Sequence, residues 1–298
     1  MSKSYVSAFR AMTAALLAAE EKILGPNRTW YSVNRLQRRL LQEIFSITRR
    51  GNNLIKGIET EVSWEADIIN AFLKRNGMTI ELQPFGPDTF GFAAIMKVGA
   101  PWIVPGVSLP LNGANGETYP GALIEYERHL RQTNVAFSVS RRHSEPIVTL
   151  STQSDVLVHL TKFNQDLDAF DLAAQVDEIF FETKRFYDFG GVHFPMVDLD
   201  VDVDVSWLLE MYTFLDDGTR AWLSQALQQF KLRMNHLGAK AEDAFAGMVT
   251  LECYNAPKPN LVIDESFLVV FVQPGLSQPL CSVVVRPDAW KDPGDITF

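Results

Sequence analysis

The sequence predicts an α+β fold, because stretches with helical spacing come first and strand-like stretches follow. In residues 1–77, apolar side chains recur three or four positions apart, which is typical of amphipathic helices. After Gly77, short runs rich in β-branched and aromatic residues alternate with Gly, Pro, Asn and Ser. The sequence has no internal repeat and no clear linker. We therefore expect one domain over 1–298, mostly helical over 1–77 and mostly strands over 78–298.

The helical expectations rest on spacing and on breaks. A first helix over 6–23 is interrupted by "GPNRT", and a second over 36–47 stops at Gly51. A third is expected in "WEADIINAFLKRNG" (64–77), and a later one near 165–178. "SWLLEMYTFLDDG" (206–218) is typical of a short helix or turn.

The strand expectations follow from composition. The strands are predicted at 79–85, 89–99, 134–141, 146–151, 155–163, 192–205, 227–236, 266–273 and 280–287. The clearest one is "VHFPMVDLDVDVDV" (192–205), in which valines and Leu199 alternate with Asp198, Asp200, Asp202 and Asp204. Alternate residues on one strand lie about 6.5–7 Å apart, so four such carboxylates cannot surround one calcium ion. A solvated strand face is the favoured interpretation.

Composition excludes several functions. The chain is 47% hydrophobic and 21% charged, which is typical of a globular protein. A net charge of −9 argues against general nucleic-acid binding. No apolar window is long enough for a membrane span, and the N-terminus lacks a leader pattern. We expect a cytoplasmic protein, or a secreted one whose leader has been removed, that binds neither nucleic acid nor membranes.

Motifs for catalysis are missing. The sequence contains no G-x-S-x-G, H-E-x-x-H, P-loop or G-x-G-x-x-G pattern. Its two cysteines, Cys253 and Cys281, do not have metal-ligand spacing. We therefore expect no enzyme, no cofactor and no metal. An unrecognised hydrolase stays a lesser alternative, and it needs two histidines to converge on a serine or on Cys253.

Five stretches in the same order resemble conserved segments of the serpins, a family of large metastable protease inhibitors. They are "AAIMKVGAPW" (93–102), "VHFPMVDLD" (192–200), "LSQALQQFKLRMNHLGAKA" (223–241), "ESFLVVFVQ" (265–273) and "CSVVVRP" (281–287). The resemblance implies a helical N-terminal part, a main mixed or antiparallel sheet and a C-terminal β-barrel-like sheet. A further stretch, "NRTWYSVNRL" (27–36), more weakly resembles the family segment that opens a buried helix. The interval between Asn27 and Ala93 is short for the family, so several mid-chain family elements are expected to be missing.

The resemblance also implies a site. It places Trp102 at the top of the main sheet, and an exposed reactive loop over about 239–263. The hinge and first part of this loop comprise Gly238, Ala239, Lys240, Ala241, Glu242, Asp243, Ala244 and Phe245. The candidate bait bond lies near Glu252, Cys253 and Tyr254. His236 and Met196 occupy the two positions at which the family has a Glu–Lys ion pair.

Inhibition in the family requires the cleaved loop to insert as a new strand, which buries alternate side chains. Ala239 and Ala241 suit that role, but Asp243 and Phe245 follow in the same parity. A buried unpaired carboxylate is costly, and a bulky ring overpacks the seam. The favoured function is therefore a protein-binding module with weak or no inhibition. The alternative is a suicide inhibitor with its bait in 250–255. The partner is a protein, with a protease as one candidate, and the oligomeric state is left open.

Overall fold

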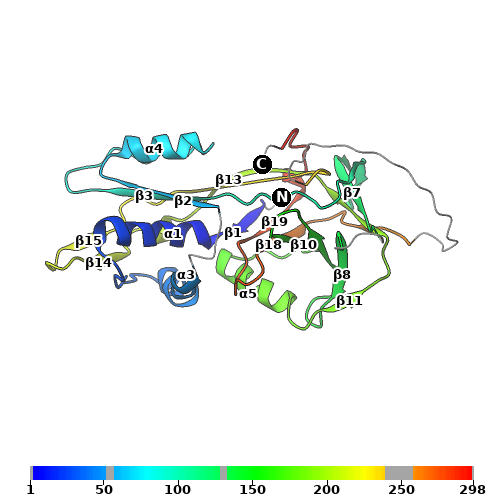
Figure 1. The fold of residues 1–298 in the computed structure, drawn as a ribbon, viewed down its shortest axis with the longest axis horizontal. Coiled ribbons are helices and arrows are strands. Elements are labelled where there is room, and N and C mark those ends of the chain that lie inside the picture. The colour runs from blue at the N-terminus through cyan, green and yellow to red at the C-terminus, as the bar shows by residue number, and fades with distance from the viewer. Residues whose placement is uncertain (1–2, 52–56, 128–132, 239–257, 297–298) are drawn as a thin grey trace. The chain divides into compact units, whose positions relative to one another are not determined.

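The computed structural model describes residues 3–51, 57–127, 133–238 and 258–296 (Figure 1). The chain divides into two compact units. Unit 1 comprises residues 1–7, 99–199 and 232–298, and unit 2 comprises residues 8–98 and 200–231. Each unit is described by itself, and the single domain expected from the sequence stays a prediction.

A seven-stranded sheet forms the centre of unit 1. Its strand order is β1-β19-β18-β10-β9-β8-β11, and all of its pairs are antiparallel. The strands are β1 (Tyr5–Ser7), β8 (Val135–Val139), β9 (Ile147–Ser151), β10 (Leu157–Lys162), β11 (Lys184–Phe186), β18 (Phe267–Val272) and β19 (Cys281–Val285). The predicted strands 134–141, 146–151, 155–163, 266–273 and 280–287 are confirmed.

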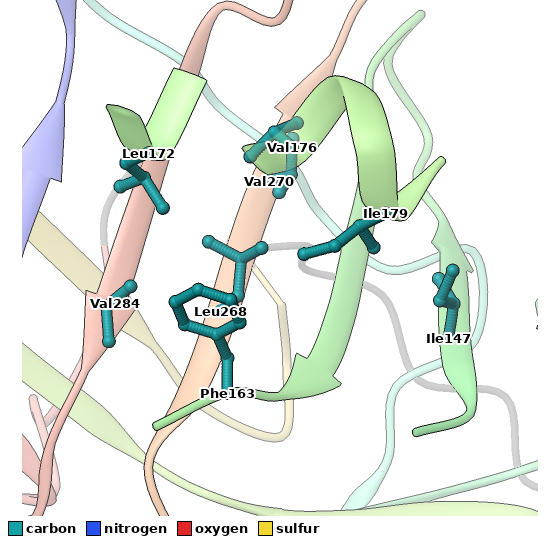
Figure 2. Close-up of a cluster of buried hydrophobic side chains, with 8 residues drawn as sticks. All are labelled: Ile147, Phe163, Leu172, Val176, Ile179, Leu268, Val270 and Val284. Carbon is teal, nitrogen blue, oxygen red and sulfur yellow. The ribbon is translucent and has the colours of Figure 1, made fainter. Parts of the chain in front are cut away.

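The core of unit 1 lies between this sheet and helix α5 (Ala169–Ile179), which confirms the helix expected near 165–178. Asp168 caps α5, because its carboxylate accepts hydrogen bonds from the backbone N–H groups of Phe170 and Asp171 at 2.9 and 2.8 Å. Figure 2 shows helix side chains pointing toward strand side chains. The buried cluster consists of Ile147, Phe163, Leu172, Val176, Ile179, Leu268, Val270 and Val284.

A second, four-stranded sheet of unit 1 has the order β17-β12-β7-β4. Its strands are β4 (Val107–Ser108), β7 (Gly121–Glu125), β12 (Gly191–Pro195) and β17 (Leu261–Val262), and β17 runs parallel to β12. A small pair, β5 (Leu111–Asn112) with β6 (Thr118–Tyr119), and the 3₁₀ turn η5 (Pro287–Ala289) complete the unit.

The expected β-barrel-like C-terminal sheet is wrong for the described residues. The C-terminal strands β18 and β19 lie inside the seven-stranded sheet, whose edge strands β1 and β11 do not pair with each other. An antiparallel sheet closes into a barrel only when its edge strands pair, so this sheet stays open.

The N-terminus also differs from the prediction. The helix expected over 6–23 begins at Phe9, because Tyr5–Ser7 pair with β19 as strand β1. Burial of Val6 in that strand outweighs the weak local helical preference. The Ser4 hydroxyl accepts a hydrogen bond from the backbone N–H of Arg286 at 3.1 Å, which holds the start of the strand.

Unit 2 is built on the hairpin of β2 (Ile58–Ser63) and β3 (Gly91–Met96). Helices α1 (Phe9–Ala19) and α4 (Ala66–Arg75) both contact this hairpin, and Figure 1 shows them on opposite sides of it. Helix α4 confirms the helix expected in 64–77. The α4 side packs through the apolar side chains of Ile69, Phe72, Leu73 and Ile95.

The rest of unit 2 consists of short elements. They are η1 (Glu20–Leu24), α2 (Arg35–Arg39), η2 (Leu40–Phe45), α3 (Ser46–Gly51), η4 (Ser206–Leu208), β14 (Tyr212–Phe214) and β15 (Arg220–Trp222). Segments η1 and η2 are π-helical, and they continue α1 and α2. The buried Glu20 carboxylate joins η1 to α3 and to the segment after η1: it lies 2.5 Å from Arg49 Nη2 and accepts a hydrogen bond from Trp30 Nε1 at 2.8 Å.

The strand expected at 79–85 is wrong, although its alternating pattern is real. Residues 78–85 form an extended segment that we call the strap. Its apolar side chains Met78, Ile80, Leu82 and Phe85 pack on the α4 cluster. Its backbone N–H groups at Thr79 and Gln83 donate to the side chains of Gln229 and Gln225 at 2.8 Å each, and not to another strand.

Strands β13 (Val197–Val203) and β16 (Gln228–Met234) pair with each other. They confirm the strands expected at 192–205 and 227–236, except that 192–195 belong to β12. Among the described residues, no helix has both the length and the apolar character needed to cross a membrane.

Candidate functional site at the end of strand β16

The backbone after β16 folds into a tight turn. The Asn235 side-chain oxygen accepts a hydrogen bond from Leu237 N at 2.9 Å, and Gly238 N donates to Asn235 O at 3.3 Å. Asn235 is only 3% exposed, and its side-chain amide also donates to Gly294 O at 3.2 Å. Asparagine is well suited to such turns, because its side chain satisfies the backbone two residues on. The turn ends the strand at a fixed point.

Trp102 holds this turn from the other side. Its indole N–H donates to Asn235 O at 3.0 Å, and its side chain is 3% exposed. The ring makes an edge contact with Phe194, at 6.5 Å between centroids and 87° between planes. Trp102 also forms an isolated bridge with Thr152. The tryptophan expected at the top of the main sheet therefore contacts the residue directly after β16.

Gly238 is required at this place for two reasons. Its φ of +72° lies in the left-handed region, which favours glycine. A Cβ atom on Gly238 would lie 2.3 Å from Trp102 N and 2.7 Å from Trp102 Cγ. The predicted hinge glycine thus packs directly on the predicted top-of-sheet tryptophan.

His236 and Met196 have different surroundings. The half-buried His236 accepts a hydrogen bond at its backbone oxygen from Gly106 N at 2.7 Å. Its Nδ1 is buried, with no hydrogen-bond partner within the described part of the chain. Met196 is 1% exposed, and its backbone N–H donates to Pro120 O at 2.8 Å. A thioether carries no charge, so these positions cannot form the ion pair of the family.

The remaining predicted loop residues lie outside the described residues. These are Ala239, Lys240, Ala241, Glu242, Asp243, Ala244, Phe245, Glu252, Cys253 and Tyr254. After residue 257 the chain is anchored again in unit 1. Gly190 N donates to Pro259 O at 3.0 Å, and Ile263 N donates to His193 O at 2.8 Å. Both flanks of the predicted loop, Gly238 and Pro259, therefore have fixed backbone partners.

The aspartate strand does not form a metal site within the described part. Asp198 pairs with Arg233 at 3.3 Å, and Asp200 pairs with Lys231 at 3.0 Å, both across from β13 to β16. The Asp204 carboxylate accepts from Ser206 N at 2.9 Å. No group of three or more His, Cys, Asp or Glu residues suited to a metal occurs among residues that the structure describes. Cross-strand ion pairs on a largely exposed face agree with the solvated-face interpretation.

The ring nitrogens of three described histidines contact threonine hydroxyls or a backbone oxygen, and not a serine or a cysteine as the hydrolase alternative requires. His143 Nε2 and His159 Nδ1 contact threonine hydroxyls, Thr161 and Thr149, at 2.8 and 2.9 Å. His193 Nε2 lies 3.1 Å from a backbone oxygen. Complete burial raises the pKa of the Cys281 thiol to about 12, which disfavours the nucleophilic thiolate. His129 and Cys253 lie outside the described residues.

Sequence reasoning missed Asn235 and Gly106 as parts of the site. The "NHLG" stretch (235–238) carries a usable signal, because Asn followed by Gly within four residues is typical of a turn. Gly106 has no comparable signal, because its role depends on the hydrogen bond to His236, which lies 130 positions later in the sequence.

Comparison with known proteins gives matches in structure alone. No family model matches the sequence, and no curated protein matches it. Many solved serpin structures match over nearly the whole chain. One is SRPN18 from Anopheles gambiae, with a TM-score of 0.61, 11% identity, and coverage of 98% of this chain and 93% of that chain.

Two further matches have names that indicate different functions. Mouse protein-Z dependent protease inhibitor matches with a TM-score of 0.58 and 11% identity, over 96% of this chain and 91% of that chain. Thyroxine-binding globulin in complex with thyroxine matches with a TM-score of 0.58 and 12% identity, over 95% of this chain and 92% of that chain. The chain therefore has an α+β fold of the serpin type, as the sequence motifs indicated. Its sequence is highly divergent from these serpins.

Proposed function

We propose that this chain is a protein-binding module that presents the residues between Gly238 and Pro259 as an exposed reactive-type loop and inserts that loop poorly after cleavage. The last part of the segment expected from the sequence, 239–263, is not in this loop, because Leu261–Val262 form strand β17 and Ile263 is buried. The fold by itself selects neither inhibition nor simple binding, since it is shared with a protein named as a protease inhibitor and with one named as a thyroxine-binding globulin. The proposal therefore depends on the residues at the hinge and in the loop.

The observation that carries the proposal is the packing of Gly238 on Trp102 at the end of β16. A hinge must let the chain leave the strand at one defined residue. Gly238 supports this role through its positive φ and its direct contact with the tryptophan. The fixed flanks Gly238 and Pro259 would present the intervening residues as one loop on unit 1.

Poor insertion follows from the loop sequence. In an inserted strand, Ala239, Ala241, Asp243 and Phe245 would point to the same face, because side chains alternate. An unpaired carboxylate in the interior costs several kcal/mol, on the order of 3–5 kcal/mol. Overpacking by a phenyl ring adds about 1–3 kcal/mol. A shift of register by one residue would bury Lys240 and Glu242 in their place.

Limited proteolysis followed by thermal unfolding tests the proposal. We expect a protease to cut the wild-type chain within 239–263 and the cut protein to show little gain in melting temperature. The double variant Asp243→Ala, Phe245→Ala should gain much more after the same cut, since its alternate positions are small and uncharged. The control variant Lys240→Ala, Glu242→Ala changes the opposite parity and should behave like the wild type.

The outcomes separate the competing functions. A large gain in melting temperature for the cut wild type would contradict poor insertion and favour the suicide inhibitor with bait in 250–255. A protein that resists cleavage throughout 239–263 would contradict the exposed loop itself. A protein-binding module without a working trap predicts a clean cut and an unchanged melting temperature.

A further inference from the structure

Unit 2 contains a cavity of about 750 Å³, which we call the unit 2 cavity. Its walls come from helix α1, strand β3, the strap (78–85) and residues 205–231, all within unit 2. Pockets for small molecules typically measure about 300–1,000 Å³, so the volume suits one drug-sized ligand. The hinge, the loop and Trp102 all belong to unit 1, so this cavity is not part of the candidate site described above.

Small side chains on one face of α1 leave this space open. Ala8, Ala11, Met12 and Ala15 all line the cavity. Their spacing of three, one and three residues puts them on the same helix face. An apolar helix face is normally filled by large side chains, and a native interior leaves few voids larger than a water molecule. Three alanines on this face therefore mark a space that the chain itself leaves unfilled.

Several polar groups of the lining have partners within the protein. Gln228 donates to Ala8 O at 2.8 Å, and Gln225 and Gln229 accept from the strap at 2.8 Å each. Lys231 pairs with Asp200 at 3.0 Å. The charged lining residues are two cations and two carboxylates, Arg220, Lys231, Asp88 and Asp217, so their formal charges cancel. The lining thus has no net charge to offset the lost hydration of a charged ligand, which favours a neutral occupant.

Aromatic rings define the shape of the occupant. Trp30, Trp64 and Trp222 line the cavity, together with Phe90, whose ring lies 5.4 Å from that of Trp64. Trp64 and Trp222 are 58% and 60% exposed, which is unusual for the largest apolar side chain. Exposed apolar groups at a hollow mark ligand-binding places. Aromatic faces bind flat rings by stacking or edge contacts.

We propose that the unit 2 cavity is a binding site for a neutral, apolar small molecule with a flat ring system. The strap gives this ligand a way in. The Thr79 and Gln83 amides of the strap are held by the half-buried side chains of Gln229 and Gln225 rather than by a strand ladder. The backbone of Leu82 exchanges two further hydrogen bonds with the Asn70 side chain of α4, at 2.8 and 2.9 Å. Opening the strap breaks these side-chain bonds, each about 0.5–1.5 kcal/mol, and the packing of its partly buried apolar side chains on the α4 cluster, but it breaks no strand ladder.

Fluorescence titration with N-phenyl-1-naphthylamine, a neutral aromatic probe, tests the site on the full chain. We expect saturable binding of one probe per chain, with energy transfer from tryptophan, because three tryptophans line the cavity. Pyrene should displace the probe, since it is neutral and flat. Displacement by palmitate or by a peptide of residues 239–250, but not by pyrene, would overturn the proposed ligand class.

Variants locate the binding. Ala11→Leu adds bulk to the cavity wall and should weaken probe affinity by at least about tenfold, equivalent to 1.4 kcal/mol. The control Ala71→Leu makes the same change at an exposed position of α4 outside the lining. Trp222→Ala removes an exposed ring and should lower both affinity and energy transfer, which keeps the test valid if Ala11→Leu folds poorly. Unchanged affinity in Trp222→Ala and in folded Ala11→Leu would refute the site, whatever the outcome for the reactive-type loop.

Discussion

Replacing Gly238 with alanine tests the central feature of the proposed hinge, its contact with Trp102. The added methyl group meets two separate obstacles. The backbone at Gly238 has φ of +72°, and the new Cβ would lie 2.3 Å from Trp102 N. Real Cβ atoms do not approach a backbone nitrogen this closely, so either the turn or Trp102 has to move.

A matched control separates the conformational cost of Gly238→Ala from its steric cost. Gly116, also in unit 1, has φ of +82° and no atom within 4 Å of its missing Cβ. Gly116→Ala therefore measures the conformational cost alone, which is about 1–2 kcal/mol for a left-handed residue. Gly238→Ala carries the same cost plus an overpacking term of about 1–3 kcal/mol. Both changes restrict the unfolded chain equally, so that contribution cancels in the comparison.

The assay is urea unfolding, monitored by circular dichroism and by tryptophan fluorescence. We expect Gly238→Ala to lose at least about 1 kcal/mol more than Gly116→Ala. The double variant Gly238→Ala, Trp102→Ala should show a coupling energy of comparable size, because removing the indole relieves part of the clash. Equal losses in the two glycine variants, with no coupling to Trp102, would refute the packing argument.

Three further predictions concern buried polar groups. Glu20→Ala should lower the free energy of unfolding by about 3 kcal/mol in urea, because it strands Arg49 and the Trp30 indole N–H, whereas Glu20→Gln should lose less. Iodoacetamide should leave Cys281 of the native protein unmodified at neutral pH and label it only after unfolding, as measured by peptide mapping; rapid native labelling would contradict its burial. Burial lowers the pKa of His159 to about 4 from 6.5, so the unfolded chain binds more protons between these pH values. Stability should therefore fall by up to about 3 kcal/mol as pH drops from 6.5 to 4, and His159→Gln should lack this component.

The sequence predicted those parts of the fold that depend on local pattern. The runs of β-branched and aromatic residues in 266–273 and 280–287 identified β18 and β19, and the spacing in 64–77 identified α4. The resemblance of two short motifs also singled out Gly238 and Trp102, which the structure brings into contact, while the hinge role of Gly238 stays a prediction. A local pattern shows which face of an element is apolar, and it can be read from one segment of the sequence without knowing its neighbours.

Other parts depended on contacts between distant segments. Residues 5–7 have no strand signal of their own and become β1 because β19 offers an open edge. The expected barrel failed for a related reason, since closure depends on whether two edge strands meet, and no single strand encodes that. The ordered motifs predicted the serpin fold, while the pairing of its sheets came from the structure.

The strap and the unit 2 cavity show why an apparent local rule can mislead. Residues 79–85 have the period-two pattern of a strand, and their apolar side chains do face inward. Their backbone partners include the side chains of Gln225, Gln229 and Asn70, which take the place of a neighbouring strand. Because these partners are side chains, the strap is not part of a strand ladder. It borders the unit 2 cavity, whose α1 wall is rich in alanine. A segment held by side-chain amides next to unfilled apolar space is less costly to move than a paired strand. Hydrogen exchange should therefore be faster at the Thr79 and Gln83 amides than in β3, and neutral ring ligands should slow it.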